Sequence, residues 1–237
     1  MAGRRKWLGA IVGLACGLAA GGAEAAEAAK TAKAPPALNH AVVCPPFKGD
    51  TVVAGLYHAE MVRMLKSTPG IEYFEGARPL PEFVFRVNGA VETNEEGQVF
   101  VQVTVLDAAR KEQIASHVAP ASLEPALIAG WSRTIQADMT RRAAKLPFEC
   151  RISRKLGQES ISLDRGLGAG LVPGMVLYVS ADEEPLISPA TGEIVGRDSP
   201  RAIGQIQIFR VMDDAAYARP TLNDKLPRFE KLFARSF

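Results

Sequence analysis

The sequence contains few of the residues on which most enzymes and metal proteins depend. Only three of its 237 residues are histidine and three are cysteine. His40, His58 and His117 have no partner four residues away that would complete a metal site on a helix, and no serine lies in the Gly-x-Ser-x-Gly turn of a hydrolase. We therefore expect no metal, no cofactor and no catalytic residue, and we expect that the protein is not an enzyme.

The chain also lacks an excess of charge once its first residues are set aside. Residues 1–25 have a basic start, an apolar run from Leu8 to Ala20 and a small-residue cleavage site at Ala23-Glu24-Ala25, which is the pattern of a secretory signal peptide. The apolar run is too short for a permanent transmembrane helix. Cleavage after Ala25 removes three of the 28 basic and one of the 26 acidic residues, which leaves 25 of each. We expect a periplasmic location and no nucleic-acid partner.

Two other export signals fit this segment less well. Arg4-Arg5 resembles the start of a twin-arginine signal. Cys16 is a possible lipidation site, although Gly13-Leu14-Ala15 lacks the large aliphatic residue wanted three positions upstream. We expect membrane attachment only if Cys16 is lipidated.

Cleavage leaves two cysteines, Cys44 and Cys150. An isolated pair in an oxidising compartment favours a disulfide, which would close a long loop and stabilise the fold. The alternative is two buried free thiols, since cysteine is among the most frequently buried residues.

A linker and then two regions with different periodicity follow the signal. Residues 26–40 are rich in Ala, Lys and Pro and predict a disordered linker. Residues 41–147 predict an α/β domain with five strands and two helices: a parallel strand–helix–strand unit, a three-stranded meander and a long second helix. Asp50 or Thr51 is expected to cap the first helix and Ser122 the second. We expect the second helix to cover the sheet with a stripe of Leu123, Leu127, Trp131, Ile135 and Met139.

From residue 148 to 220 the helical periodicity gives way to Gly, Pro and short alternating strands, which predicts a small β-barrel of the SH3 or OB type. The predicted fold class is therefore α+β, an α/β domain followed by a barrel. Residues 221–237 form a tail that either folds as an amphipathic helix or frays. The apolar residues spaced for such a helix are Leu222, Leu226, Phe229, Leu232 and Phe233.

Four glycines, Gly166, Gly168, Gly170 and Gly174, fall within nine positions. Their spacing is G-x-G-x-G, a strand follows them, and no Lys-Ser/Thr pair ends the segment. Because no helix begins here, the segment lacks the free N–H groups that hold a phosphate. The sequence predicts a tight turn at a corner of the barrel.

Basic residues gather where the two regions meet. Glu149 is the only acid among them, and they suit either a solvated helix end and linker or a patch for an acidic protein or an anionic envelope polymer. The residues of this patch are Arg141, Arg142, Lys145, Arg151, Arg154 and Lys155.

The segment ISLDRGLGAGLVPGMVLYV, a Pro-x-Thr-Gly-Glu-x-x-Gly hairpin and the strand Ile203–Ile208 together resemble the C-terminal domain of flagellar assembly protein T. The preceding region is similar to the middle domain of that family, to the N-terminal domain of TolB and to the curli-secretion channel family, through Pro46-Phe47 and Leu106-Asp107. It differs in having residues 108–111 (Ala-Ala-Arg-Lys) where the family has Thr-Gly, and it has only a linker in place of a further N-terminal domain. The turn glycines that carry the resemblance are Gly166, Gly170, Gly174, Gly192 and Gly196.

The resemblance implies a non-enzymatic periplasmic scaffold, an accessory component of the flagellar basal body. The alternative it implies is an outer-membrane-associated secretion-channel component or activator of an envelope enzyme. The partners implied are envelope proteins, including basal-body rings, and the protein could also form a homo-oligomer or ring. Turn glycines specify a backbone rather than a chemistry, so they are informative about fold more than about function.

Overall fold

The computed structural model describes residues 37–76, 78–156, 160–181, 185–191, 194–197, 202–221, 226 and 231–236. The expected signal peptide, most of the linker, Cys16 and Gly192 lie outside these residues. The end of the expected linker is ordered, because His40 begins the first strand and is buried.

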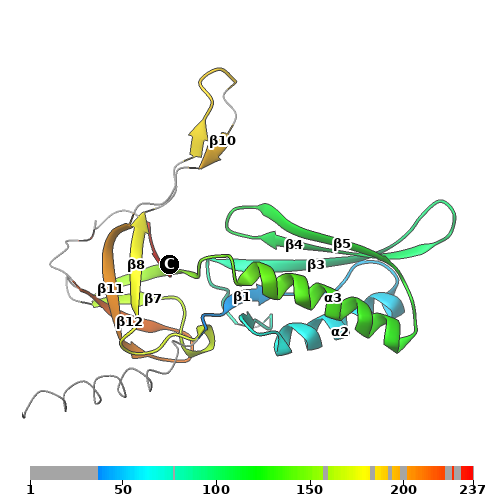
Figure 1. Ribbon diagram of the computed structural model, residues 1–237, viewed down its shortest axis with the longest axis horizontal. Helices are drawn as coiled ribbons and strands as arrows, with labels where there is room; N and C mark the ends of the chain where they lie inside the picture. The colour runs from blue at the N-terminus through cyan, green and yellow to red at the C-terminus, as the bar shows by residue number, and fades with distance from the viewer. Residues whose placement is uncertain are drawn as a thin grey trace, which may run out of the picture. The chain divides into compact units, whose positions relative to one another are not determined.

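A five-stranded sheet forms the first part of the fold, in the order β2-β1-β3-β4-β5 (Figure 1). β1 pairs in parallel with β2 and β3, and β3, β4 and β5 form an antiparallel meander. Asn94 ends the β3 strand because its side chain accepts the N–H groups of Glu96 and Gln98. The strands are β1 (His40–Val43), β2 (Ile71–Tyr73), β3 (Val84–Thr93), β4 (Val99–Asp107) and β5 (Glu112–Pro120).

Helices α2 (Thr51–Ser67) and α3 (Pro125–Ala143) pack together on one face of the sheet (Figure 1). Asp50 caps α2 by accepting the N–H groups of Val52 and Val53. The expected Ser122 cap of α3 is wrong: Ser122 Oγ accepts the N–H of Glu124, which occupies the cap position, and Pro125 starts the helix.

The expected apolar stripe of α3 is correct only in its C-terminal part. Ile135 and Met139 are buried in the core of the sheet and Trp131 is half-buried. Leu123 and Leu127 are 65% and 57% exposed. The stripe therefore continues past the point where the sheet and α2 can cover it.

A closed barrel forms the second part of the fold, in the order β11-β12-β7-β6-β13-β8. Leu163, Leu177, Ile206 and Ile208 fill its interior together with small residues from β12. The strands are β6 (Glu149–Leu156), β7 (Ser160–Leu163), β8 (Val176–Ala181), β11 (Ala202–Val211), β12 (Ala216–Pro220) and β13 (Leu232–Arg235). The predicted α+β fold class is confirmed.

The tail is not helical where the structure describes it. Residues 232–235 form β13, which pairs with β6 on one side and β8 on the other. Leu232, Phe233 and Ala234 are all buried. The helical spacing of the apolar residues did not predict this strand. The segment is a strand because the barrel closes only when a strand lies between β6 and β8.

Two strands of residues 148–220, the region expected to form the barrel, lie outside it. β9 (Pro185–Ile187) and β10 (Ile194–Arg197), which contains Gly196, form a separate two-stranded sheet (Figure 1). The barrel instead includes β13, which comes from the expected tail, and β6, which contains Arg151, Arg154 and Lys155 of the expected basic patch. Among the described residues, no helix has both the length and the apolar character needed to cross a membrane.

Candidate functional site

The glycine-rich segment lies where the barrel meets the strand β1. Residues Leu167–Ala169 form one turn of 3-10 helix (η1), and Gly170 follows in the left-handed region with φ of 78°. Asn39, just before β1, donates from its main chain to the carbonyl of Ala169 and from its side chain to that of Gly168, both at 2.9 Å. The segment therefore joins two parts of the fold, beyond turning the chain.

Three of these glycines are closely approached by other atoms, and a side chain on Gly170 would overlap the carbonyl of Ala37. A side chain on Gly166 would overlap the main chain at Met212, Asp213 and Ala215. A side chain on Gly168 would overlap the carboxylate of Glu72, a β2 residue. Gly174 has a φ of 90° with open space around it, so its role is conformational.

Arg165 is the central residue of this contact. Its guanidinium donates through Nη2 to the carbonyl of Asn39 and to Glu72 Oε2, both at 2.8 Å. It lies over the rings of Phe74 and Phe148 and is only 2% exposed. A buried arginine paired with one carboxylate and stacked on two aromatic rings fixes the geometry of its surroundings.

A second charged cluster joins the end of β4 to β6. Arg110 donates to both carboxylate oxygens of Glu149 and to Asp107, each at 2.9 Å, and Arg235 also pairs with Glu149. Burial by itself would lower the pKa of Arg110, but the hydrogen bonds and charges of Asp107 and Glu149 outweigh it and raise the pKa. Arg110 belongs to the residues 108–111 in which the chain departs from the resembled family, so this departure supplies a contact to the barrel.

Two further titratable groups near this contact are perturbed by burial. Burial lowers the pKa of His40, whose Nε2 lies 3.0 Å from the carbonyl of Ala143. Burial raises the pKa of Asp164, which accepts the main-chain N–H groups of Glu82 and Arg151. Both groups bridge the sheet and the barrel or the helix, so their hydrogen bonds serve the architecture.

The structure divides the expected basic patch. Arg141 and Arg142 both donate to Asp138, and Arg151 pairs with Glu82 at 2.9 Å. Lys145 is exposed and has no ion pair in the described part of the chain. The side chains of Arg154 and Lys155 lie outside the described residues.

Cys44 and Cys150 are free and buried, so the expected disulfide is wrong. Cys44 belongs to the core between the sheet and its helices, whereas Cys150 belongs to the core of the barrel. Two thiols held in separate cores cannot come within bonding distance without unfolding. Burial raises the pKa of Cys44 to about 12 and also raises that of Cys150.

We expect both thiols to react slowly with an alkylating reagent in the native protein, because each is buried and protonated at neutral pH. Denaturation without reductant should then label Cys44 and Cys150 completely, as measured by mass spectrometry of the two peptides. Labelling that requires prior reduction would show that they are disulfide-bonded.

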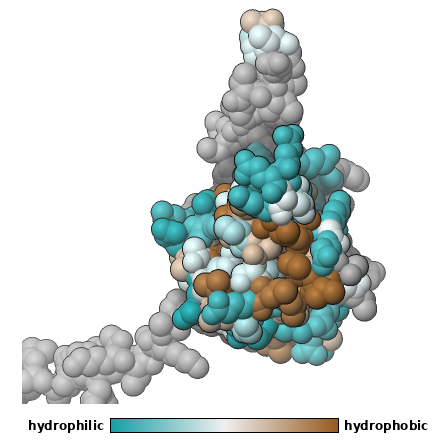
Figure 2. Space-filling view, turned by 90° about the vertical axis from the view of Figure 1, so that its right-hand side faces the viewer, coloured by the Kyte–Doolittle hydropathy of each residue, from teal (hydrophilic) through white to brown (hydrophobic). Residues whose placement is uncertain are grey.

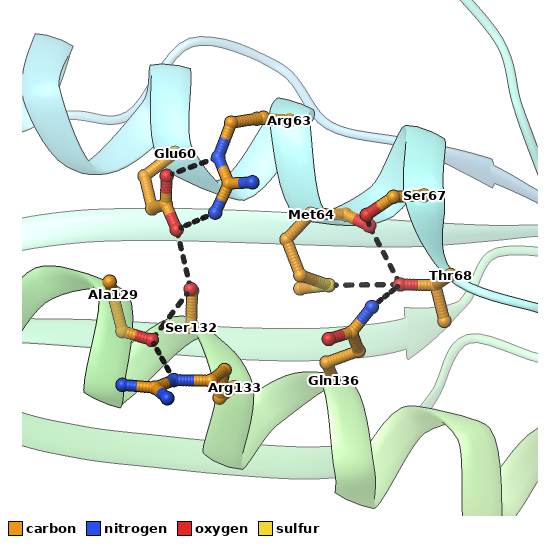
Figure 3. A network of polar contacts seen from close by, with 9 residues as sticks. All are labelled: Glu60, Arg63, Met64, Ser67, Thr68, Ala129, Ser132, Arg133 and Gln136. Atoms are coloured by element: carbon orange, nitrogen blue, oxygen red, sulfur yellow. Dashed lines mark hydrogen bonds and ion pairs between the residues drawn. The ribbon is translucent and has the colours of Figure 1, made fainter.

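Polar contacts fix how α2 and α3 lie against each other (Figure 3). Ser132 donates to Glu60 Oε1 at 2.6 Å, and Gln136 donates to the hydroxyl of Thr68. A hydrogen bond from Arg63 lowers the pKa of Glu60, which is therefore a carboxylate acceptor for Ser132 at neutral pH. Ser132 is 1% exposed, so the pair aligns the helices in a place that no substrate reaches.

The same alignment brings the starts of the two helices together. Tyr57 accepts the N–H of Ser122 at 3.0 Å and packs edge-on against Trp131 with ring centroids 4.8 Å apart. Leu56 precedes Tyr57 and Leu123 follows Ser122, and both leucines are exposed.

We call the exposed apolar residues at this end the helix-start surface. Figure 2 faces this end and shows apolar residues gathered within a hydrophilic surround. Large apolar groups exposed together on a soluble domain mark sites of contact with other molecules. The residues of the helix-start surface are Val52 (67% exposed), Leu56 (45%), Leu123 (65%) and Leu127 (57%).

The sequence did not predict the residues that join the sheet to the barrel. Arg165 sits directly before the glycine cluster, and that arginine-glycine adjacency was the available signal. Glu72, Arg110 and Glu149 gave none, because isolated charges in turns and short strands are ordinarily solvated. Within the described residues no group of three or more His, Cys, Asp or Glu side chains is arranged to hold a metal ion.

Comparison with known protein families and with curated proteins finds no match. Solved structures with a similar fold include TolB from Acinetobacter baumannii, at 11% identity and a TM-score of 0.35 over 82% of this chain and 63% of that one. Lipoprotein GNA1162 from Neisseria meningitidis is similar at 13% identity and a TM-score of 0.27, over 45% of this chain and 98% of that one. The PelC dodecamer from Paraburkholderia phytofirmans is similar at 14% identity and a TM-score of 0.29, over 46% and 94%.

These similarities are too weak to carry an activity, a partner or a site to this chain. The chain spans 63% of TolB, so TolB contains a further part that has no counterpart in the match.

Proposed function

We propose that the protein is a non-enzymatic scaffold of the bacterial cell envelope that works by binding other proteins. The observation that carries this proposal is the helix-start surface. Its four large apolar side chains are between 45% and 67% exposed. Such a surface suits the apolar face of a protein partner better than a charged polymer or a small polar substrate.

The contacts between barrel and sheet support the same role. Arg165 and Arg110 each connect the barrel to the sheet region through ion pairs with buried or nearly buried carboxylates. A scaffold has to present its binding surfaces in a fixed relation, and buried, hydrogen-bonded ion pairs favour one arrangement over others.

The export signal expected in residues 1–25 supports a periplasmic location for this scaffold. The finer proposal is an accessory component of the flagellar basal body, supported by the resemblance of the glycine segment and the I-G-x-I-x-I strand to flagellar assembly protein T. In that role the helix-start surface would contact another basal-body protein.

The proposal is tested by replacing Leu123 and Leu127 together with lysine in the chromosomal copy. Because both side chains are exposed, we expect the free energy of unfolding to change by less than about 1 kcal/mol. We expect swimming in soft agar to fall to the level of a deletion strain, because a charge in an apolar interface is costly to bury.

The matched control is Leu80→Lys, since Leu80 is 45% exposed in a loop away from the helix starts. This variant should swim normally. A deletion strain that swims and has an intact motor by tomography would reject the flagellar role. The scaffold proposal itself fails if Leu123→Lys/Leu127→Lys complements every envelope defect of the deletion strain as well as the unaltered protein does.

A further inference from the structure

The strand β5 is one edge of the five-stranded sheet, because only β4 pairs with it (Figure 1). It has 9 residues, whereas β2, at the opposite edge, has 3, and the barrel is closed. An edge strand presents main-chain N–H and C=O groups that the sheet does not use, and proteins protect these groups with charges, proline, a bulge or a covering side chain. The protection of β5 therefore decides whether another strand can pair with it.

The hydrogen bond at the end of β5 shows which of its main-chain groups point outward. Ala121, directly after β5, donates its N–H to the carbonyl of Val99. In an antiparallel pair, hydrogen-bonded and non-hydrogen-bonded residue pairs alternate. With the observed register, the odd-numbered residues 115–119 therefore bond to β4. The main-chain groups of Ser116 and Val118 point away from the sheet.

Both ends of β5 are protected, and its middle is not. At its start the register shifts, and Arg142 Nη1 donates to the outward carbonyl of Ile114 at 2.9 Å. At its end Pro120 has no N–H group to offer. Between them, the main-chain groups of Ser116 and Val118 have no hydrogen-bond partner among the described residues. No Asp, Glu, Lys or Arg occurs in residues 113–120, so the open stretch also lacks a protecting charge.

We propose that β5 pairs with β5 of a second copy of this chain, antiparallel and about a two-fold axis at His117. In this register Ser116 exchanges both main-chain hydrogen bonds with Val118 of the second copy, and Val118 does the same with Ser116. A two-fold interface uses the same residues on both sides, which one shared edge strand provides. The two five-stranded sheets then form one continuous sheet.

The ends of β5 favour a second copy over an unrelated strand. In the same register Pro120 lies opposite Ile114 of the second copy. Pro120 cannot donate a hydrogen bond, but the Ile114 carbonyl that would need one is already bonded to Arg142. The missing donor at one end therefore meets the end at which no donor is needed. The two-fold axis makes this match occur twice, whereas an unrelated strand would gain nothing from either feature.

The side chains on both faces of the sheet fit this pairing. Val118 is 62% exposed and would lie opposite Ser116 and diagonal to Val118 of the second copy, so that its apolar surface is partly covered. His117 points to the other face, where its Nε2 lies 3.2 Å from Oδ2 of Asp138 in α3. The two copies of His117 would meet there, each beside a carboxylate that offsets positive charge. This interface is separate from the helix-start surface and does not depend on the scaffold role.

The register predicts a specific cross-link. His117→Cys places a thiol directly opposite its own copy in a non-hydrogen-bonded pair, where Cα atoms are about 4.5 Å apart, a separation that a disulfide spans. We expect mild oxidation of the mature protein to give a covalent dimer on non-reducing electrophoresis. Ala119→Cys is the matched control, because residue 119 is opposite residue 115 and so lies about 14 Å along the strand from its own copy. It should give no covalent dimer.

Sedimentation of the mature protein over a range of micromolar concentrations measures the association, and we expect a reversible dimer. Ser116→Pro removes an outward N–H without breaking a bond to β4. Because both copies carry the change, the dissociation constant should rise about tenfold or more. Val118→Lys should act in the same direction and serves as a second test if the proline disturbs the strand. Val176→Lys, at a residue of β8 that is 43% exposed, should leave the dimer unchanged.

The proposal is overturned if the mature protein stays monomeric at several hundred micromolar, or if neither Ser116→Pro nor Val118→Lys weakens the dimer. It is also overturned if His117→Cys cross-links no more than Ala119→Cys. A dimer that is lost in Leu123→Lys/Leu127→Lys and kept in Ser116→Pro would place the contact at the helix-start surface and would likewise overturn it.

Discussion

Gly166→Ala is expected to destabilise the protein by about 3 kcal/mol or more. The added methyl group would overlap main-chain atoms of three residues in the β11–β12 turn, Met212, Asp213 and Ala215. Main chain within a closed barrel cannot move aside as a flexible side chain can, so the overlap has to be relieved by shifting a strand end. Urea or thermal unfolding followed by circular dichroism measures the change.

Gly97→Ala is the matched control for this substitution. Gly97 lies in the β3–β4 turn with φ of 80° and has open space around it. Its replacement meets only the conformational cost of a left-handed residue, about 1 kcal/mol. Gly166 has a negative φ of −134°, so a loss for Gly166→Ala no larger than that for Gly97→Ala would contradict the account based on close approach.

Arg165→Ala is expected to cost about 3–5 kcal/mol. The substitution leaves the Glu72 carboxylate, 11% exposed, with only the more distant guanidinium of Arg78, at 3.9 Å, and it removes the cation stacked on Phe74 and Phe148. Removing one member of a buried ion pair is strongly destabilising because the remaining charge is uncompensated. The loss is measured by denaturant unfolding at neutral pH.

Two comparisons separate this effect from a general loss of charge. Lys66→Ala breaks the exposed pair between Lys66 and Glu75 and should cost far less stability than Arg165→Ala, because water screens an exposed pair. Adding Glu72→Gln to Arg165→Ala should recover part of the loss, because the nearly buried negative charge is then gone. This account would be contradicted if the double variant lost more stability than the two single variants lose when their losses are added.

The sheet and its helices could be predicted because their signals are local. The alternation in β3, β4 and β5 and the Asn94–Gly97 turn fix the meander, and the helical spacing after Asp50 fixes α2. Each of these patterns is contained within about 20 residues. What the sequence did not indicate was where the apolar stripe of α3 leaves the core, because that depends on the length of the partner helix and sheet.

The sequence predicted that a barrel is present but did not predict all of its strands. The expected region, residues 148–220, contains five of its six strands, but it also contains β9 and β10, which lie outside the barrel, and it leaves out β13. The pairing of β13 with β6 and β8 joins residues far apart in sequence, and no local pattern in Leu232–Arg235 distinguishes a four-residue strand from a turn of helix. The same limit applies to Arg165, whose partners Asn39 and Glu72 come from the opposite end of the chain.

The order of the barrel strands has a consequence for how the protein is made. The first barrel strand, β6, stays unpaired on one edge until β13 is available, and almost the whole barrel separates the two in sequence. The sheet with α2 and α3 has no such requirement and can form while later residues are still being synthesised. The barrel must wait, with β6 and β8 presenting open edges in the interval. A variant truncated after residue 231 should therefore retain the folded sheet but should not form the closed barrel. Residues 232–235 thus cover the edges of β6 and β8, and a nascent chain is protected from edge-to-edge aggregation only once they have been synthesised.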